Sequence, residues 1–300
     1  MISRLAQQNK KLTENAEGPF FVDTTCIDCD ACRWLAPENF ARGREQSFVK
    51  RQPETQAETE KVWRALTACP TASIGAVGLP RPAGFKDLFP VHVHGPVYHC
   101  GYHAASSHGA ASYLIRHPKG NIMVDSPRFS RTLVNKIKEW GGVRTLFLTH
   151  VDDVADHEKY AREFSCARIM HREDVSHDLR GIEIQVEQER YELHDNAILH
   201  HVPGHTPGHM VLQLDEKYLF TGDHLAWSGD RGHLVAFRDY CWHSWEEQTA
   251  SMEKTALLKF EWIMPGHGRM FQAGPERMHQ EMSNLIRWMK SGMGRDNMHG

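Results

Sequence analysis

The chain has 300 residues, 40% of them hydrophobic and 24% charged, with a formal net charge of −3 at pH 7. This composition is that of a globular protein, and the length suits one large domain plus a small one. The near-neutral charge argues against a nucleic-acid partner, and no apolar run is long enough to span a membrane. The N-terminal residues MISRLAQQNKKLTENAEG contain no apolar stretch of the kind that secretory leaders carry.

Four of the seven cysteines form one pattern near the N-terminus. Cys26, Cys29 and Cys32 are separated by two residues each, and Cys69 follows with Pro70 directly behind it. Three closely spaced thiolates can hold one side of an inorganic cluster, and a distant fourth completes the ligand set of a [4Fe-4S] cluster. Zinc is the alternative, although zinc sites more often use two spaced pairs. The remaining cysteines are interpreted as small buried hydrophobic residues: Cys100, Cys166 and Cys241.

These cysteines resemble those of the bacterial ferredoxins. In two-cluster ferredoxins a further Cys-Pro follows the third cysteine, but here that place holds Ala36-Pro37. The resemblance is therefore to the single-cluster type, and it implies one-electron transfer or structural support. Within it, ETQAETEKVWRALTAC has apolar residues at helical spacing, and ASIGAV is expected to form a short strand. Thiolate ligation of one [4Fe-4S] cluster implies a reducing compartment, so the cytoplasm is the expected location.

The segment GLPRPAGFKDLFP is a candidate domain boundary. It holds three prolines and two glycines, so it cannot continue a helix or a central strand. We interpret it as a linker between two domains. The predicted organisation is an N-terminal extension at 1–16, a ferredoxin-like domain at 17–78, a linker at 79–90, a second domain at 91–290 and a C-terminal tail at 291–300.

The second domain alternates short apolar runs with helical segments. SRTLVNKIKEWGG and ADHEKYAREF have helical periodicity. Strands are expected at SYLIRH, NIMVDSP, TLFLTH, ARIMHR, AILHHVP, MVLQLD, KYLFTGD and WIMPGHG. In several of these a histidine or an aspartate comes directly after the apolar run. Side chains at strand ends can converge on a common cleft.

Four strand ends carry a set of residues that resembles the metallo-β-lactamase superfamily. These ends hold His150 with Asp156-His157, His205 in PGHTPGH, Asp223 in FTGDH and His267 in MPGHG. They occur in the order of that family over about residues 92–290. The resemblance implies an α+β chain, in which the ferredoxin-like domain precedes a four-layer αββα sandwich. It also implies that His205, Asp223 and His267 are metal ligands, with Asp223 bridging two metals.

One motif departs from the family pattern, which is His-x-His-x-Asp-His. In THVDDVADH, Asp152 stands where the second histidine belongs, and the next two ligand positions hold Val154 and Ala155. A two-residue insertion would instead let Asp156 and His157 supply that pair. A helix that begins near Asp152 would bring Asp152 and Asp156 onto one face. Capping of a helix N-terminus is the competing explanation for one of these aspartates.

The resemblance therefore implies two ligand sets. The first metal would be bound by His150, Asp152 or Asp153, His205 and Asp223. The second would be bound by Asp156, His157 or both, together with Asp223 and His267. A carboxylate in place of the second histidine resembles the flavodiiron branch of the superfamily. Carboxylates also favour iron or manganese more than an all-histidine set would. The expected cofactors are thus one [4Fe-4S] cluster and one or two divalent metals, zinc or iron.

Three functions follow from these features. The first is a hydrolase of an ester, thioester or similar small-molecule substrate, with metal-bound hydroxide as nucleophile. Its catalytic residues would be Asp223 as the bridge and an aspartate such as Asp156 as general base. The second is a di-iron oxidoreductase that receives electrons from the cluster and from a redox partner protein. The third is a non-catalytic electron carrier, against which the ordered ligand set argues.

Two further features have open interpretations. His209 in PGHTPGH is expected to support the metal site rather than to bind metal. The segment RDYCWHSW has aromatic residues suited to a substrate wall, and it suits a packed turn equally well.

Overall fold

The computed structural model describes residues 5–291, and within them the chain forms two compact units. The first unit comprises the chain up to Arg144 together with Ala155–Cys166. The second comprises Thr145–Val154 together with the chain from Ala167 onward. The cysteine-rich region and the first strands of the predicted second domain both belong to the first unit. The predicted C-terminal tail lies outside the described residues, apart from Ser291.

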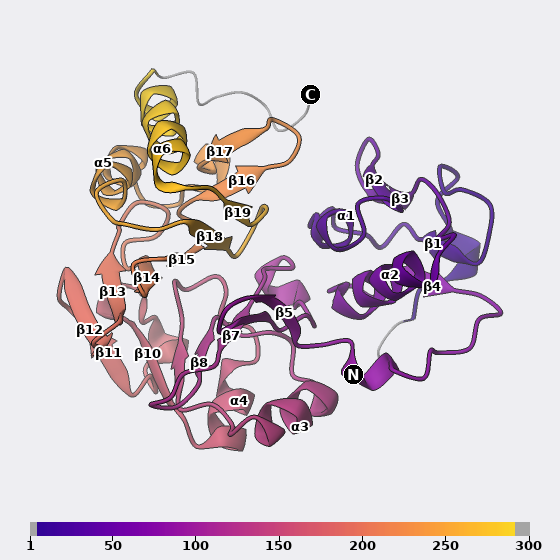
Figure 1. Cartoon of the computed structure of the whole chain (residues 1–300), viewed down its shortest axis with the longest axis horizontal. Helices are drawn as coiled ribbons and strands as arrows, with labels where there is room; N and C mark the ends of the chain where they lie inside the picture. Colours follow the sequence, from indigo (N-terminus) through magenta and orange to yellow (C-terminus); the bar gives the residue numbers. More distant parts are fainter. Residues whose placement is uncertain (1–4, 292–300) are drawn as a thin grey trace. The chain divides into compact units, whose positions relative to one another are not determined.

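The cysteine-rich region pairs short strands with two helices (Figure 1). Its elements are β1 (Phe20–Val22), α1 (Ala31–Leu35), β2 (Phe40–Arg42), β3 (Ser47–Val49), α2 (Gln56–Ala68) and β4 (Ile74–Ala76). β1 pairs with β4 and β2 with β3, both antiparallel. α2 begins where the Thr55 hydroxyl accepts a hydrogen bond from the Glu58 N–H, an N-cap that satisfies a free amide of the first turn. α2 buries Trp63, whose ring meets Phe20 edge to face. The predicted helix and closing strand are confirmed.

The rest of the first unit is an antiparallel set of four strands and two helices. The strands, in sheet order, are β5 (Val91–His94), β6 (Val97–His99), β7 (Tyr113–Ile115) and β8 (Ile122–Val124). The helices are α3 (Arg131–Glu139) and α4 (His157–Phe164). α3 buries Leu133, Val134 and Ile137 completely, as the predicted periodicity requires. The predicted strands at SYLIRH and NIMVDSP are confirmed as β7 and β8.

The start of α4 corrects one prediction. The helix begins at His157 and not near Asp152, because the residues before it form turns and Ala155 has a left-handed φ of 30°. Consequently, Asp152 and Asp153 belong to a turn and not to a helix face. Their side chains are placed by the loop that follows β9.

The second unit contains two sets of strands and two long helices. β9 (Thr145–Phe147), β10 (Ala167–His171) and β11 (Ile184–Val186) are parallel. A six-stranded sheet follows the order β12 (Arg190–His194), β13 (Ala197–His201), β14 (Met210–Leu214), β15 (Tyr218–Gly222), β18 (Trp262–Pro265) and β19 (Phe271–Gln272). β15 and β18 are parallel, and the other neighbours are antiparallel. The remaining elements are the hairpin of β16 (Ala226–Ser228) and β17 (His233–Val235), α5 (Trp245–Thr255) and α6 (Pro275–Lys290).

The six-stranded sheet is the centre of the core of the second unit. Every residue of β14 and β15 is buried, so both faces of these strands are covered. Val211, Leu219 and Ile263 belong to one apolar cluster with Met252 of α5 and Met282 of α6. Burial of each such side chain contributes about 1.5–3 kcal/mol. This rigid centre fixes the loops that leave β13, β15 and β18.

No helix among residues 5–291 has both the length and the apolar character needed to cross a membrane.

Candidate metal centre and cluster site

The four predicted cluster ligands line one cavity in the first unit. The thiols of Cys26, Cys29, Cys32 and Cys69 face this cavity together with apolar side chains such as Val22 and Ile74. Burial raises the pKa of the Cys29 thiol to about 12 and raises that of the Cys32 thiol well above its ordinary value. Four convergent thiols in an apolar pocket are the ligand set of a [4Fe-4S] cluster, which binds thiolates and so must displace their protons. The residues present therefore fit such a cluster.

The surroundings of the cysteines leave little free space. A Cβ on Gly109 would lie 2.7 Å from Cβ of Cys29, so only glycine allows this approach of the backbone. The Ser73 N–H lies 3.3 Å from the Cys69 sulfur and donates to it. Because N–H donors to cluster sulfurs tune the reduction potential, the backbone at Ser73 contributes to the properties of a bound cluster.

The other predicted ligands gather at the ends of strands in the second unit. His150 and the two aspartates after it follow β9, and Asp223 follows β15. His205 lies on the loop between β13 and β14, and His267 follows β18. Side chains remote in sequence are therefore brought to one site by the order of the strands.

A first set of donor atoms has the spacing of a metal-binding site. Nε2 of His205 lies 3.3 Å from Oδ2 of Asp152 and 3.8 Å from Oδ2 of Asp223. Nε2 of His150 lies 3.7 and 3.9 Å from the same two oxygens. Four ligands at about 2.0–2.2 Å from a tetrahedral metal stand about 3.3–3.6 Å apart. Neither Nε2 atom has a hydrogen-bond partner among the described residues, although both are buried. These residues fit a divalent metal.

A second set of donors also lies around the Asp223 carboxylate. Asp153 is buried, and its carboxylate lies within 4.8 Å of donor atoms of His150 and Asp223. Nδ1 of His267 lies 2.8 Å from Oδ1 of Asp223. A Cβ on Gly266 would lie 2.6 Å from Oδ2 of Asp153 and 3.0 Å from Oδ1 of Asp223. Asp223 thus lies between the two sets, which suits a carboxylate that bridges two metals.

The charges of the site favour the protonation states that bind metal. Burial raises the pKa of Asp223, but the adjacent His267, His150 and His205 outweigh it and hold its pKa far below the usual range. Burial lowers the pKa of His150 to about 4, against the opposite effect of Asp223. The adjacent His205 imidazole lowers the pKa of Asp152. At neutral pH the site therefore offers ionised carboxylates and a neutral His150, the forms that bind metal.

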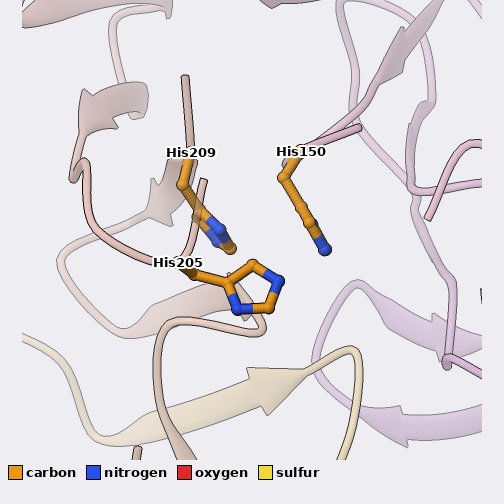
Figure 2. Close-up of side chains that lie close together, drawn as sticks. All are labelled: His150, His205 and His209. Carbon is orange, nitrogen blue, oxygen red and sulfur yellow. The ribbon is translucent and has the colours of Figure 1, made fainter. Parts of the chain in front are cut away.

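His209 lies closer to the site than the sequence indicates. Its Nε2–H donates to the Thr221 carbonyl, and its ring stacks on that of His150 at 4.7 Å. Its donor atom lies within 4.8 Å of those of His150 and His205, and Figure 2 shows the three rings together. Nδ1 of His209 has no hydrogen-bond partner within residues 5–291. The second histidine of PGHTPGH thus supports the ring of His150 and is also a candidate third imidazole ligand.

Asp174 is a functional residue that the sequence does not reveal. It is buried, and its carboxylate accepts hydrogen bonds from Val151 N–H at 3.1 Å, Thr206 Oγ1 at 2.6 Å and Gly208 N–H at 2.7 Å. It therefore ties the loop of His150 to the loop of His205. Its position after β10 in MHREDV resembles other strand-end polar residues, and only the fold shows which loops it joins.

Asp156 and His157 belong to the first unit. The Asp156 carboxylate accepts hydrogen bonds from Phe129 N–H at 2.7 Å and from Lys159 Nζ at 2.6 Å. His157 is the first residue of α4 and is buried. The clusters of three metal-binding side chains within residues 5–291 include neither residue. Their role as ligands, and that of Asp156 as general base, stays a prediction.

A second imidazole pair lies elsewhere in the second unit. The rings of His171 and His201 stack at 3.7 Å, and Oε2 of Glu173 lies 3.7 Å from Nε2 of His201. That nitrogen also donates to the Pro207 carbonyl at 2.8 Å. His201 is therefore engaged through this nitrogen, whereas the buried Nε2 of His171 has no hydrogen-bond partner within residues 5–291, and the two histidines with Glu173 form a separate group with metal-binding spacing.

Comparisons with known proteins show the family of the chain. The family model of the metallo-beta-lactamase superfamily matches residues 108–267, which is just over half of the chain. The chain belongs to this superfamily. The model of the 4Fe-4S single cluster domain of ferredoxin I matches residues 22–76. Both resemblances predicted from the sequence are confirmed, with the cofactors that they imply.

Individual relatives are more distant. The Beta-lactamase-like protein 2 homolog of Drosophila melanogaster is 26% identical over 195 residues, which cover 58% of this chain and 63% of that protein. The chain thus spans less than two thirds of that relative. The crystal structure of VMB-1 has a TM-score of 0.52 at 15% identity and covers 68% of this chain and 96% of its own. A structure of the DIM-1 metallo-beta-lactamase has a TM-score of 0.52 at 16% identity, covering 66% and 95%. These structures show the fold alone.

Proposed function

We infer that this member of the superfamily is a metal-dependent hydrolase that cleaves an ester, a thioester or a similar acyl bond. The observation that carries this proposal is the exposure of the first donor set. His150 and His205 are 0% and 2% exposed, whereas the Asp152 side chain is 43% exposed. Structural metal sites are closed, and catalytic sites keep one side open for water and substrate. A donor set that is buried on its histidine side and open at a carboxylate suits catalysis.

The chain's own residues supply charge, geometry and a path for the proton. Metals bound here would lower the pKa of a coordinated water and polarise the carbonyl of the substrate. Asp223 joins the two donor sets, because its carboxylate lies 3.8 Å from Nε2 of His205 and 2.8 Å from Nδ1 of His267. Asp152 is the carboxylate that solvent reaches, so it can take a proton from the attacking water and pass it on. Its pKa is lowered by His205, so it stays ionised between turnovers.

The test is hydrolysis by the metal-loaded chain on a panel of esters and thioesters, with metal content measured on the same sample. We expect turnover that disappears after chelation and returns after metal is restored. An absence of turnover at full metal occupancy across the panel would reject the proposal.

A second function is favoured by one observation, the number of carboxylates. Three aspartates at positions 152, 153 and 223 accompany the histidines, and oxygen donors favour iron or manganese over zinc. An iron centre next in sequence to a cluster domain suits a di-iron oxidoreductase, with a redox partner protein as electron source. Element-resolved metal analysis separates the two functions. Iron in the second unit with reduction of an added substrate would support the oxidoreductase, and zinc in that unit would reject it.

A further inference from the structure

Two large aromatic side chains stand exposed on the turn before α5. Tyr240 is 46% exposed and Trp242 is 62% exposed. Among residues 5–291, they are the aromatic members of the exposed large hydrophobic side chains, and they lie two residues apart. Their rings meet edge to face, with centroids 5.9 Å apart. Exposed aromatic groups of this kind often mark a binding surface, because water contact with them is unfavourable.

This aromatic pair is attached to the metal centre. The indole Nε1–H of Trp242 donates to Oδ2 of Asp152 at 3.0 Å, the same oxygen that faces His150 and His205. The backbone N–H groups of Trp242 and His243 both donate to the His205 carbonyl, at 2.9 and 3.2 Å. The turn is therefore fixed to a ligand loop at several points. The aromatic pair lies beside the open side of the donor set.

Two basic side chains next to the pair are engaged elsewhere. The Arg238 guanidinium lies over the Trp245 ring at 5.4 Å, and Nε2 of His243 lies 3.3 Å from the Glu247 carboxylate. Because these two side chains are engaged with α5, the charge that contacts the pair is the Asp152 carboxylate, which meets the indole N–H at the edge of the Trp242 ring. A planar apolar group suits this surface better than an anionic or a strongly polar one.

We propose that Tyr240 and Trp242 form a binding wall for an aromatic acyl group, so that the preferred substrates are esters or thioesters of aryl-substituted acids. This inference rests on the proposed hydrolase function. The indole edge of Trp242 is held by Asp152, which leaves the ring face for stacking. Aromatic rings pair at centroid distances of about 4.5–7 Å, so a ring one or two bonds from the reacting carbonyl is within reach.

The first experiment measures binding without turnover. Isothermal titration of the full, metal-loaded chain would compare phenylacetate with cyclohexylacetate, which has a similar size but no aromatic ring. Aromatic pairing adds about 0.5–1.5 kcal/mol, so we expect phenylacetate to bind about 2–12-fold more tightly. Tyr240→Ala should remove this preference, and Tyr240→Phe should retain it. Leu257→Ala, a change at a side chain 84% exposed, is the matched control and should leave the ratio unchanged.

The second experiment measures specificity during turnover. For a phenylacetyl thioester, Tyr240→Ala should raise KM about 5-fold with little change in kcat, because stacking acts equally in the ground and transition states. The acetyl thioester should show no such rise. Trp242→Phe retains a ring but loses the N–H on Asp152, so it should alter the pH profile of kcat more than it alters KM.

The outcomes separate the wall from the hydrolase function. Loss of the phenylacetate preference in Tyr240→Ala without any hydrolysis would support the wall and reject the hydrolase. Equal affinity of the wild-type chain for phenylacetate and cyclohexylacetate would reject the wall. A phenylacetate preference that Tyr240→Ala leaves intact would also reject it. Normal hydrolysis without an aryl preference would reject the wall and leave the hydrolase standing.

Discussion

The two inorganic sites of this chain are assembled in opposite ways. Three of the cluster cysteines lie within seven residues of one another, on a loop and the short helix α1. The candidate ligands of the metal centre lie between His150 and His267, on four loops that follow different strands. The cluster site therefore depends mainly on local spacing. The metal centre depends on the order of strands in a completed fold.

The two sites also differ in the chemistry they allow. Thiols line an apolar cavity, and burial raises the pKa of Cys29 and Cys32. Such a site exchanges electrons with little change in its ligands. The metal centre combines imidazoles with carboxylates and exposes Asp152. A site with an open, charged side is suited to contact with a substrate. The cysteine-rich region therefore suits electron transfer or structural support, and the metal centre suits a reaction at a bound substrate.

The largest expected effect comes from Asp223, the residue between the two donor sets. Asp223→Ala should remove metal from both sets and lower hydrolysis by about a thousandfold or more, because its carboxylate lies beside His150, His205 and His267 together. Metal content by element analysis and turnover of a thioester measure this. Asp178→Asn, at a side chain 97% exposed, is the control. Full metal occupancy in the Asp223 variant would contradict the bridging role.

A substitution of a cluster cysteine tests whether the cluster site and the metal centre act independently. Cys32→Ser should abolish the visible absorbance and bound sulfide of the cluster, because a hydroxyl is a poor cluster ligand. It should leave the metals of the second unit in place. Cys166→Ala, a change at a buried cysteine outside the cavity, should retain the cluster. Hydrolysis that survives Cys32→Ser favours the hydrolase, and activity that vanishes while the metals remain favours the oxidoreductase.

The roles of Asp153 and Asp156 in the motif THVDDVADH can be distinguished by a matched pair of variants. Asp153→Asn should weaken metal binding by about 10–100-fold, because its carboxylate lies among the donors. Asp156→Asn should leave the metal count unchanged and lower the free energy of unfolding by about 1–2 kcal/mol, since the carboxylate accepts from Phe129 and Lys159. Metal titration and urea unfolding measure the two effects. The reverse result would restore Asp156 as a ligand.

An effect of similar size concerns pH. Burial lowers the pKa of His224 to about 3, so in the folded state it stays neutral where the unfolded chain takes up a proton. The unfolded state therefore gains protons first as the pH falls below about 6.5, and stability declines from there toward pH 3. For this residue we expect a loss of about 2 kcal/mol between pH 7.5 and 5. Urea midpoints at the two pH values measure it, and His224→Gln should reduce the slope. An unchanged slope in that variant would contradict this assignment.

Several features of the fold were accessible from sequence because they are local. The periodicity of α2 and α3 and the apolar runs of β7, β14 and β15 reflect faces that must be buried. Short strands with mixed composition, such as β16 and β17, were not predicted, because pairing in a hairpin and not composition makes them strands. The helix at ADHEKYAREF was predicted from its periodicity, and only its start differs, because the left-handed turn at Ala155 places the first helical residue at His157 and excludes a start near Asp152.

By itself, the sequence determined the kinds of chemistry present: a cysteine spacing that binds an iron–sulfur cluster, and strand-end histidines and aspartates in the order of one superfamily. Only the tertiary structure decided which of these side chains meet. It placed both Asp152 and Asp153 among the donors, brought in His209 and Asp174, and set Trp242 on the Asp152 carboxylate. The physical reason is that donor spacing depends on strand order and loop closure between residues far apart in the chain, and these distances are not encoded in local spacing.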